Sequence, residues 1–156
     1  MCGIAGILNF GGVETAPTEQ QLTSMLAAIR YRGPDESGIY LNHKLGLGNV
    51  RLSILDLSSG LQPISVRDKR YWIVYNGELF NYIEIRRELE KLGISFVTNT
   101  DTEVVLQAYA QWGPQCLQQF IGQFAIAIWD SHKEELFLAR DRVGIRPLFY
   151  TRSGDR

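Results

Sequence analysis

The chain has 156 residues, of which 45% are hydrophobic and 21% are charged, and its formal net charge is -1. These values are typical of one globular domain with its own apolar core. The sequence has no basic stripe, and none of its apolar runs reaches the roughly 18 to 20 residues of a membrane span, so we expect neither nucleic acid nor a membrane as partner. Its two cysteines, Cys2 and Cys116, indicate a reducing compartment, with the cytoplasm as the default location.

Apolar spacing and turn residues predict the first elements along the chain. Residues 3–10, GIAGILNF, are predicted to form a buried strand. Residues 18–29 begin with the Thr-x-x-Gln pattern of a capping box and continue with apolar residues at helical spacing, which predicts a helix that ends at Gly33-Pro34. Residues 38–57 are expected to form two or three short strands, and residues 71–77 form another, rich in aromatic and β-branched residues.

Helices dominate the middle of the chain, and strands follow them. Residues 81–92 are predicted to form a helix that stops at Gly93. A second capping-box pattern, Thr100 with Glu103, begins a third helix, and Gly113-Pro114 marks its end. The remaining β-prone stretches are residues 94–98, 122–130, 134–141 and 147–151.

The order of these elements predicts the fold class. Helices form a block between blocks of strands, which favours an α+β fold with antiparallel sheets over a doubly wound parallel sheet. The strands GIAGIL and FAIAIW are apolar on both faces, so at least one sheet should be covered on both sides. Two sheets that face each other, with helices outside, satisfy this requirement.

Cys2 stands directly behind the initiator methionine. Removal of Met1 would leave a thiol, with a pKa of about 8.5, beside an α-amine with a pKa of roughly 7.7 to 8.0, and this amine can serve as the general base. A cysteine at position 2 can also be accidental. A conventional Cys-His pair is the other catalytic arrangement, but His43 and His132 lie in polar, turn-like segments and are expected at the surface.

Six stretches place Cys2 in a family context. They are MCGIAG, YRGPDESG, RLSILD with LQPI, YNGELFNY, TDTEVVLQAY and RDRVGIRPLFY, in this order. Together they resemble the glutaminase domain of the class II (N-terminal nucleophile) glutamine amidotransferases, and RGPD resembles the asparagine synthetase branch. The resemblance implies one domain over residues 1–156, a mature chain that starts at Cys2, and a four-layer αββα sandwich. Family members usually continue for several more strands, so we expect a sandwich truncated at the C-terminus.

The resemblance also implies a reaction. It is hydrolysis of the side-chain amide of L-glutamine to glutamate and ammonia through a thioester on the N-terminal cysteine. The ammonia would pass to a C-terminal synthetase domain or to a separate acceptor subunit, and a homodimer stays open. No cofactor is implied for this domain, whereas ATP and magnesium would belong to the absent synthetase domain. The alternatives are a non-catalytic glutamine-binding or regulatory module, and an inactive fragment of a larger synthetase.

Matching the family's motifs to this chain assigns the site residues. Cys2 corresponds to the nucleophile, with Asn76 and Gly77 as the oxyanion hole, although an isolated Asn-Gly more often forms a type I′ hairpin turn. The residues expected to hold glutamine are Arg51, the backbone around Ile54, Glu78 and Asp101. Arg51 could instead form a surface salt bridge, and Asp101 could be an acid at a helix N-terminus.

The remaining motif residues are given structural roles. Arg32 and Asp35 in RGPD should lie near the nucleophile and position it. A buried, salt-bridged turn is expected for Arg140, Asp141 and Arg146, and an inert core thiol for Cys116.

Overall fold

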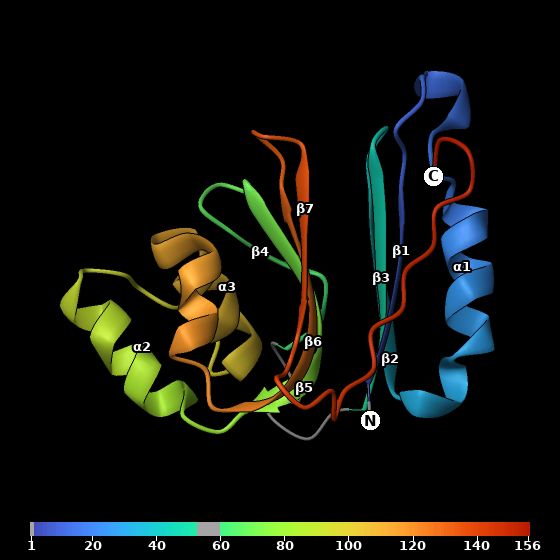
Figure 1. Ribbon diagram of the computed structural model, residues 1–156. Coiled ribbons are helices and arrows are strands. Elements are labelled where there is room, and N and C mark those ends of the chain that lie inside the picture. The colour runs from blue at the N-terminus through green and yellow to red at the C-terminus, as the bar shows by residue number, and fades with distance from the viewer. Residues whose placement is uncertain (1, 53–59) are drawn as a thin grey trace.

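The computed structural model describes residues 2–52 and 60–156 (Figure 1). Within these residues the secondary structure comprises two antiparallel sheets, three α-helices and three short 3-10 turns. The α-helices and strands are β1 (Gly3–Leu8), α1 (Glu19–Ala28), β2 (Glu36–Leu41), β3 (Leu45–Arg51), β4 (Ile64–Val66), β5 (Tyr71–Leu79), α2 (Tyr82–Lys91), α3 (Asp101–Trp112), β6 (Gly122–Asp130) and β7 (Glu135–Arg140). The 3-10 turns span Val13–Thr15, Arg30–Arg32 and Gly113–Gln118.

The described residues form four layers. One sheet has the strand order β1-β3-β2 and the other β4-β5-β6-β7. The two sheets face each other, α1 covers the outer face of the first, and α2 and α3 cover the outer face of the second (Figure 1). The predicted α+β fold with two antiparallel sheets and outer helices is therefore confirmed.

Glycines in β3 let α1 pack closely on the first sheet. A Cβ added to Gly46 would lie 2.5 Å from Leu22 Cδ1, and one added to Gly48 would lie 2.9 Å from Leu26 Cδ1. Both leucines are buried. The glycines on the outer face of this sheet thus provide the space that the helix fills.

Two apolar cores separate the layers. The core between the sheets is built around Leu45, Leu47, Val74 and Trp129. The larger core lies between the second sheet and its helices and includes Tyr75 of β5. Because successive side chains in a strand point to opposite faces, Val74 and Asn76 face the first sheet whereas Tyr75 faces α3.

The first predicted strand and the two predicted capping boxes differ in outcome. The first strand is confirmed but ends at Leu8, and most of its residues are only half-buried. Thr18 and Gln21 form the complete capping box of α1. Thr100 caps α3 by accepting a hydrogen bond from the N–H of Glu103.

The carboxylate of Glu103 explains why residues 94–98 are not a strand. It accepts hydrogen bonds from the backbone N–H groups of Val97 and Thr98, at 2.9 and 2.6 Å. These donors are therefore bound to a helix side chain, and the segment runs as a loop into α3.

Residues 147–151 are not a strand either, contrary to the prediction. The segment follows β7 and leads to the C-terminal residues, where Phe10 N–H donates to the carbonyl of Asp155 at 2.6 Å. Phe149 and Tyr150 are 90% and 86% exposed. Aromatic residues alone do not make a strand, since a strand also needs a ladder partner.

None of the described helices is long and apolar enough to cross a membrane.

Candidate active site

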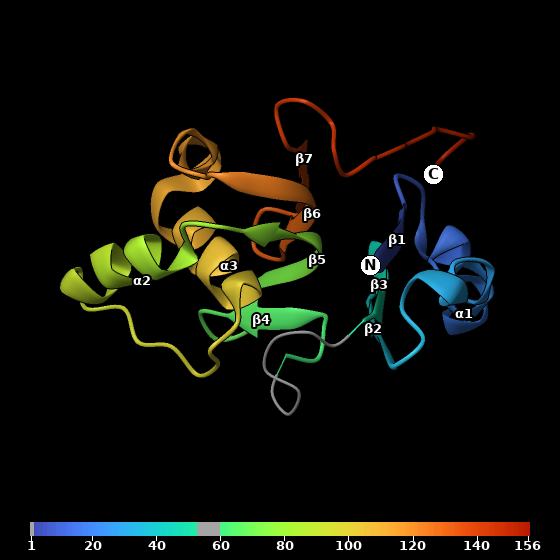
Figure 2. The same cartoon turned by 90° about the horizontal axis from the view of Figure 1, so that it is seen from below.

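Cys2 lies immediately before β1, where the first sheet ends. β1 pairs with β3 so that Gly3 lies opposite Val50, which brings Cys2 next to the end of β3. The Cys2 thiol is 3.9 Å from the carbonyl of Leu52, and Arg32 Nε donates to the carbonyl of Cys2 at 3.1 Å. Arg32 of the RGPD motif therefore lies beside Cys2, as expected. Figure 2 shows the first sheet, with β1, between α1 and the second sheet.

β5 contributes the residues on the other side. Asn76 and Gly77 lie inside this strand, opposite Ala125 and Phe124 of β6. They form neither a hairpin turn nor the end of the strand, which continues to Leu79. A Cβ on Gly77 would lie 2.4 Å from the Gln123 carbonyl oxygen, so close contact with β6 requires glycine at this position.

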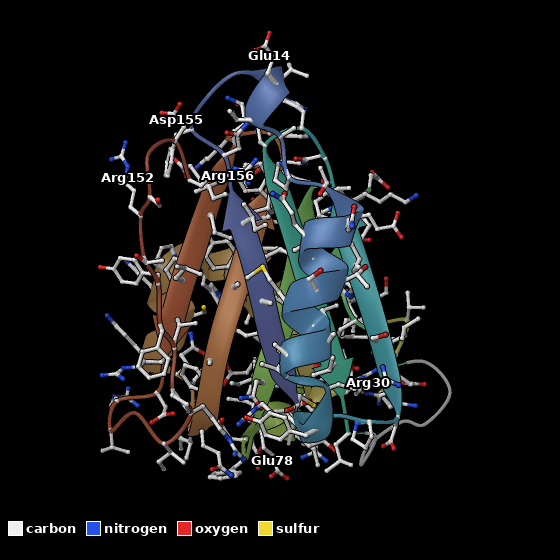
Figure 3. The ribbon with its side chains drawn as sticks, turned by 90° about the vertical axis from the view of Figure 1, so that its right-hand side faces the viewer. Glu14, Arg30, Glu78, Arg152, Asp155 and Arg156 are labelled. Atoms are coloured by element: carbon white, nitrogen blue, oxygen red, sulfur yellow. The ribbon has the colours of Figure 1, made fainter. Side chains whose placement is uncertain are left out.

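One pocket of about 200 Å³ brings most of the predicted site residues together. Cys2, Arg51, Asn76, Gly77, Glu78 and Asp101 line it. Ile54 lies outside the described residues. Glu78 is exposed at the rim, and Figure 3 shows it at the end of the molecule opposite Glu14.

Asp101 lies on the wall of this pocket, and it is also the first residue of α3. Its Oδ2 accepts hydrogen bonds from the Tyr75 hydroxyl and the Leu79 N–H, both at 3.0 Å. Burial raises the pKa of the Asp101 carboxyl, and the hydrogen bonds from Leu79, Tyr75 and Thr102 offset only part of this effect. Asp101 therefore lies at a helix N-terminus, which was one of the two expectations, and its role in binding substrate stays a prediction.

Arg51 is buried rather than part of a surface salt bridge. Its side chain is 6% exposed, and Nη1 is 2.6 Å from Glu36 Oε2 on the neighbouring strand β2. A carboxylate on one side holds the guanidinium in a fixed orientation at the pocket wall. The pocket is therefore lined by a cation at the end of β3 and an acid at the start of α3.

Several pocket residues were not predicted from the sequence. Gln62, Tyr75, Thr100, Thr102 and Arg146 line the pocket beside the expected residues. The Tyr75 hydroxyl is buried, which holds its pKa well above the ordinary value. Thr100 and Thr102 flank Asp101 in the sequence, which is the one signal that could have found them.

The buried Asp141 side chain holds the turn that follows β7. The buried Asp141 carboxylate accepts backbone N–H groups of Phe124, Ile145 and Arg146 at 3.1, 2.9 and 3.0 Å. Backbone hydrogen bonds therefore close this turn and direct Arg146 to the pocket, whereas Arg140 is exposed.

The other titratable candidates lie away from the pocket. Both histidines are exposed, and His43 Nε2 is 3.7 Å from Glu134 Oε1. Cys116 is buried, and burial raises the pKa of its thiol to about 12, as expected for an inert core thiol. Among residues 2–52 and 60–156, no group of three or more His, Cys, Asp and Glu side chains is arranged to hold a metal ion.

Known proteins resemble this chain in sequence and in fold. Residues 1–156 match the family described as glutamine amidotransferase domain. The chain is 42% identical to glutamine-hydrolysing asparagine synthetase 1 of Bacillus subtilis, over 100% of this chain and 25% of the relative. It is 40% identical to a putative glutamine-hydrolysing asparagine synthetase 2 of Methanocaldococcus jannaschii, over 99% of this chain and 33% of the relative.

The chain thus spans a quarter to a third of the length of these curated relatives. The solved structure of glutamine phosphoribosylpyrophosphate amidotransferase from Bacillus subtilis shares the fold, with a TM-score of 0.76 and 20% identity over 94% of this chain and 38% of that chain. With a family match over its whole length and relatives at 40% identity or more, the chain belongs to the glutamine amidotransferase domain family, and it is similar to the glutaminase part of asparagine synthetases.

Proposed function

We propose that the mature chain, starting at Cys2, hydrolyses the side-chain amide of L-glutamine to glutamate and ammonia in this pocket. The observation that supports the proposal best is the convergence of Cys2, Asn76 and two opposite charges, Arg51 and Asp101, on one cavity. Amide transfer from free glutamine needs a thiol, a hydrogen-bond donor to the oxyanion, and one partner each for the α-carboxylate and the α-ammonium.

The reaction proceeds in two steps at the Cys2 thiol. The α-amine of Cys2 takes the thiol proton, and the thiolate attacks the side-chain amide carbon of glutamine. The Asn76 side chain and Gly77 stabilise the oxyanion. The intermediate collapses when the C–N bond breaks and the α-ammonium returns its proton to the leaving nitrogen, which releases ammonia and leaves a γ-glutamyl thioester. Water then adds to the thioester, and the C–S bond breaks to give glutamate and the free thiol.

The charges of the pocket select a free amino acid. Arg51 binds the α-carboxylate of glutamine, because a guanidinium fork matches two carboxylate oxygens. Asp101 and the rim residue Glu78 bind the α-ammonium. Arg32 positions Cys2, because its Nε donates to the carbonyl oxygen of Cys2 at 3.1 Å.

The acceptor of the ammonia is a further part of the proposal. Curated relatives are named asparagine synthetases, and they are three to four times as long as this chain. We therefore assign the chain to asparagine biosynthesis in the cytoplasm, as the glutaminase domain beside a synthetase domain or acceptor subunit. ATP and magnesium belong to that partner, and the pocket itself needs no cofactor. Sedimentation of the processed protein distinguishes the monomer from the homodimer.

The test is glutamate and ammonia release by the processed protein and by its Cys2→Ala variant. We expect turnover only with Cys2, and loss of turnover when Met1 is retained, because the α-nitrogen is then an amide. Equal ammonia release from the two proteins ends the assignment. The competing non-catalytic module predicts another result in calorimetry, namely persistent glutamine binding by the Cys2 protein without glutamate formation.

A further inference from the structure

Gln62 is a buried glutamine that no step of the proposed reaction uses. It is 4% exposed, and it lines the pocket just before β4. Its Oε1 accepts the backbone N–H of Tyr75 at 2.7 Å, and its Nε2 donates to the Thr102 hydroxyl at 3.3 Å. Tyr75 precedes Asn76, and Thr102 follows Asp101. The carboxamide therefore touches the immediate neighbours of two proposed site residues.

The Gln62 carboxamide takes the place of a backbone peptide group at the end of the β4–β5 ladder. β4 pairs with β5 from Val66 opposite Tyr71 to Ile64 opposite Ile73, and the ladder stops there. Continuing this register would place residue 62 opposite Tyr75. A carboxamide has the same donor and acceptor as a peptide group, so the side chain satisfies the buried Tyr75 N–H while its other end reaches α3.

The main chain of Gln62 lies close against the other sheet. A Cβ added to Gly38 of β2 would lie 2.0 Å from the Gln62 carbonyl oxygen, so only glycine allows this approach. Gln62 therefore contacts the first sheet with its backbone, and the second sheet and α3 with its side chain.

Hydrogen bonds complete a ring around the pocket wall. Tyr75 is bound at its N–H by Gln62, and its hydroxyl donates to Asp101 Oδ2 at 3.0 Å. Asp101 and Thr102 are adjacent at the start of α3, and Thr102 leads back to Gln62. All four residues are more than nine-tenths buried. The ring ties the strand that presents Asn76 to the helix that presents Asp101.

We propose that Gln62 is a positioning residue that fixes the distance between the Asn76 amide and the Asp101 carboxylate, and thereby aligns glutamine against Cys2. This inference rests on the proposed function, because Asn76 and Asp101 are taken to hold the two ends of the substrate. A misplacement of about 1 Å between such groups costs about a hundredfold in rate, so loss of the ring affects both kcat and KM.

The test replaces each of two buried glutamines in the protein from which Met1 has been removed. Gln62→Met removes both hydrogen bonds at similar side-chain volume. Gln107→Met is the matched control, because Gln107 is 7% exposed, donates to the Ser95 carbonyl at 3.4 Å and is not a pocket residue. We expect Gln62→Met to lower kcat/KM for glutamine by about a hundredfold, with kcat reduced and KM raised, and Gln107→Met to stay within about threefold of wild type.

A double-mutant cycle separates positioning from general destabilisation. If Gln62 acts through Thr102, adding Thr102→Val to Gln62→Met lowers kcat/KM no further, and Thr102→Ser, which keeps the hydroxyl, restores most of what Thr102→Val loses. Additive losses, or a Gln62→Met enzyme within about threefold of Gln107→Met, overturn the inference. If Gln62→Met does not fold by circular dichroism, the comparison of Thr102→Ser with Thr102→Val decides alone.

Glutamine affinity gives a readout that does not need turnover. In a Cys2→Ala background, Gln62→Met should raise the glutamine Kd at least about tenfold, and Gln107→Met should leave it unchanged. Equal Kd values overturn the role of Gln62. Absence of glutamate production by the wild-type protein, with the Kd difference intact, instead overturns the proposed function alone.

Discussion

Asp101→Asn separates substrate binding from folding more sharply than other single changes in the pocket. Asparagine keeps the shape of the side chain and an oxygen that can accept the Tyr75 hydroxyl and the Leu79 N–H. It removes the charge and replaces one acceptor oxygen with an NH2 donor. Under the proposed function, that charge is the main partner of the substrate α-ammonium.

The size of the effect on binding follows from burial. Two unit charges about 4 Å apart attract by about 4 kcal/mol at an effective dielectric constant of about 20. Asp101 is 7% exposed, so water screens it little, but the ammonium must lose its own hydration on binding. We take the net loss in Asp101→Asn as at least about 2 kcal/mol, which raises the glutamine KM about 30-fold or more.

Asp101→Asn should weaken glutamine binding but should not lower the stability of the fold at neutral pH. Because the pKa of Asp101 is raised in the folded state, the folded chain binds more protons than the unfolded chain between the ordinary and the raised pKa. The contribution of Asp101 to stability therefore falls as pH rises through that window. Asparagine does not titrate, so the Asp101→Asn variant does not lose stability in this window. The free energy of unfolding of the variant minus that of the wild type should therefore increase from acid to neutral pH. Glutamine affinity of the wild type should fall as pH drops through the raised pKa.

The assays are steady-state glutaminase kinetics and urea unfolding over a pH series. Asp130→Asn is the matched control, since Asp130 is also buried but pairs with Arg70 at 2.8 Å, outside the pocket. The Arg70 hydrogen bond lowers the pKa of Asp130, so this residue stabilises the fold above that pKa, and its replacement should lower stability at neutral pH without changing KM. A KM for Asp101→Asn within about threefold of wild type, or a variant less stable than Asp130→Asn, would refute the reasoning.

Three further outcomes follow from the packing around the pocket. Gly77→Ala should lower the free energy of unfolding by about 1 to 3 kcal/mol in urea titration, because its Cβ would collide with the Gln123 carbonyl oxygen; an unchanged midpoint contradicts this. Arg32→Ala should lower kcat about tenfold without changing the number of titratable thiols, because it releases the carbonyl of Cys2; unchanged kcat contradicts this. A thiol reagent at neutral pH should modify one thiol per folded chain and two in denaturant, because burial raises the pKa of Cys116 to about 12; rapid labelling of two thiols in the folded chain contradicts this.

Local patterns in the sequence predicted the elements that depend on near neighbours. The Thr18–Gln21 capping box forms as expected because both partners lie within one helical turn. The Thr100–Glu103 pattern starts α3 correctly, but the Glu103 carboxylate binds the preceding loop instead, and this loop takes the place of the predicted strand 94–98. The pattern shows where a helix begins, whereas the second partner of a side chain depends on the tertiary fold.

The pocket shows the same division between motif and tertiary contact. Motif resemblance placed Cys2, Asn76 and Asp101, and the structure brings them to one cavity. Tyr75 and Gln62 could not be predicted as pocket residues, because Tyr75 points away from Asn76 along the strand and Gln62 meets Thr102 across 40 positions of sequence. Residues 147–151 have strand-like composition, but composition does not provide a ladder partner.

The contact between Arg32 and Cys2 has a consequence for the proposed removal of Met1. Arg32 holds the nucleophile by its carboxyl side, and the β1–β3 ladder begins one residue later, at Gly3. Neither anchor involves the nitrogen that an aminopeptidase would release. Under the proposed function, cutting the bond before Cys2 would therefore free the base while these two contacts keep the thiol in place.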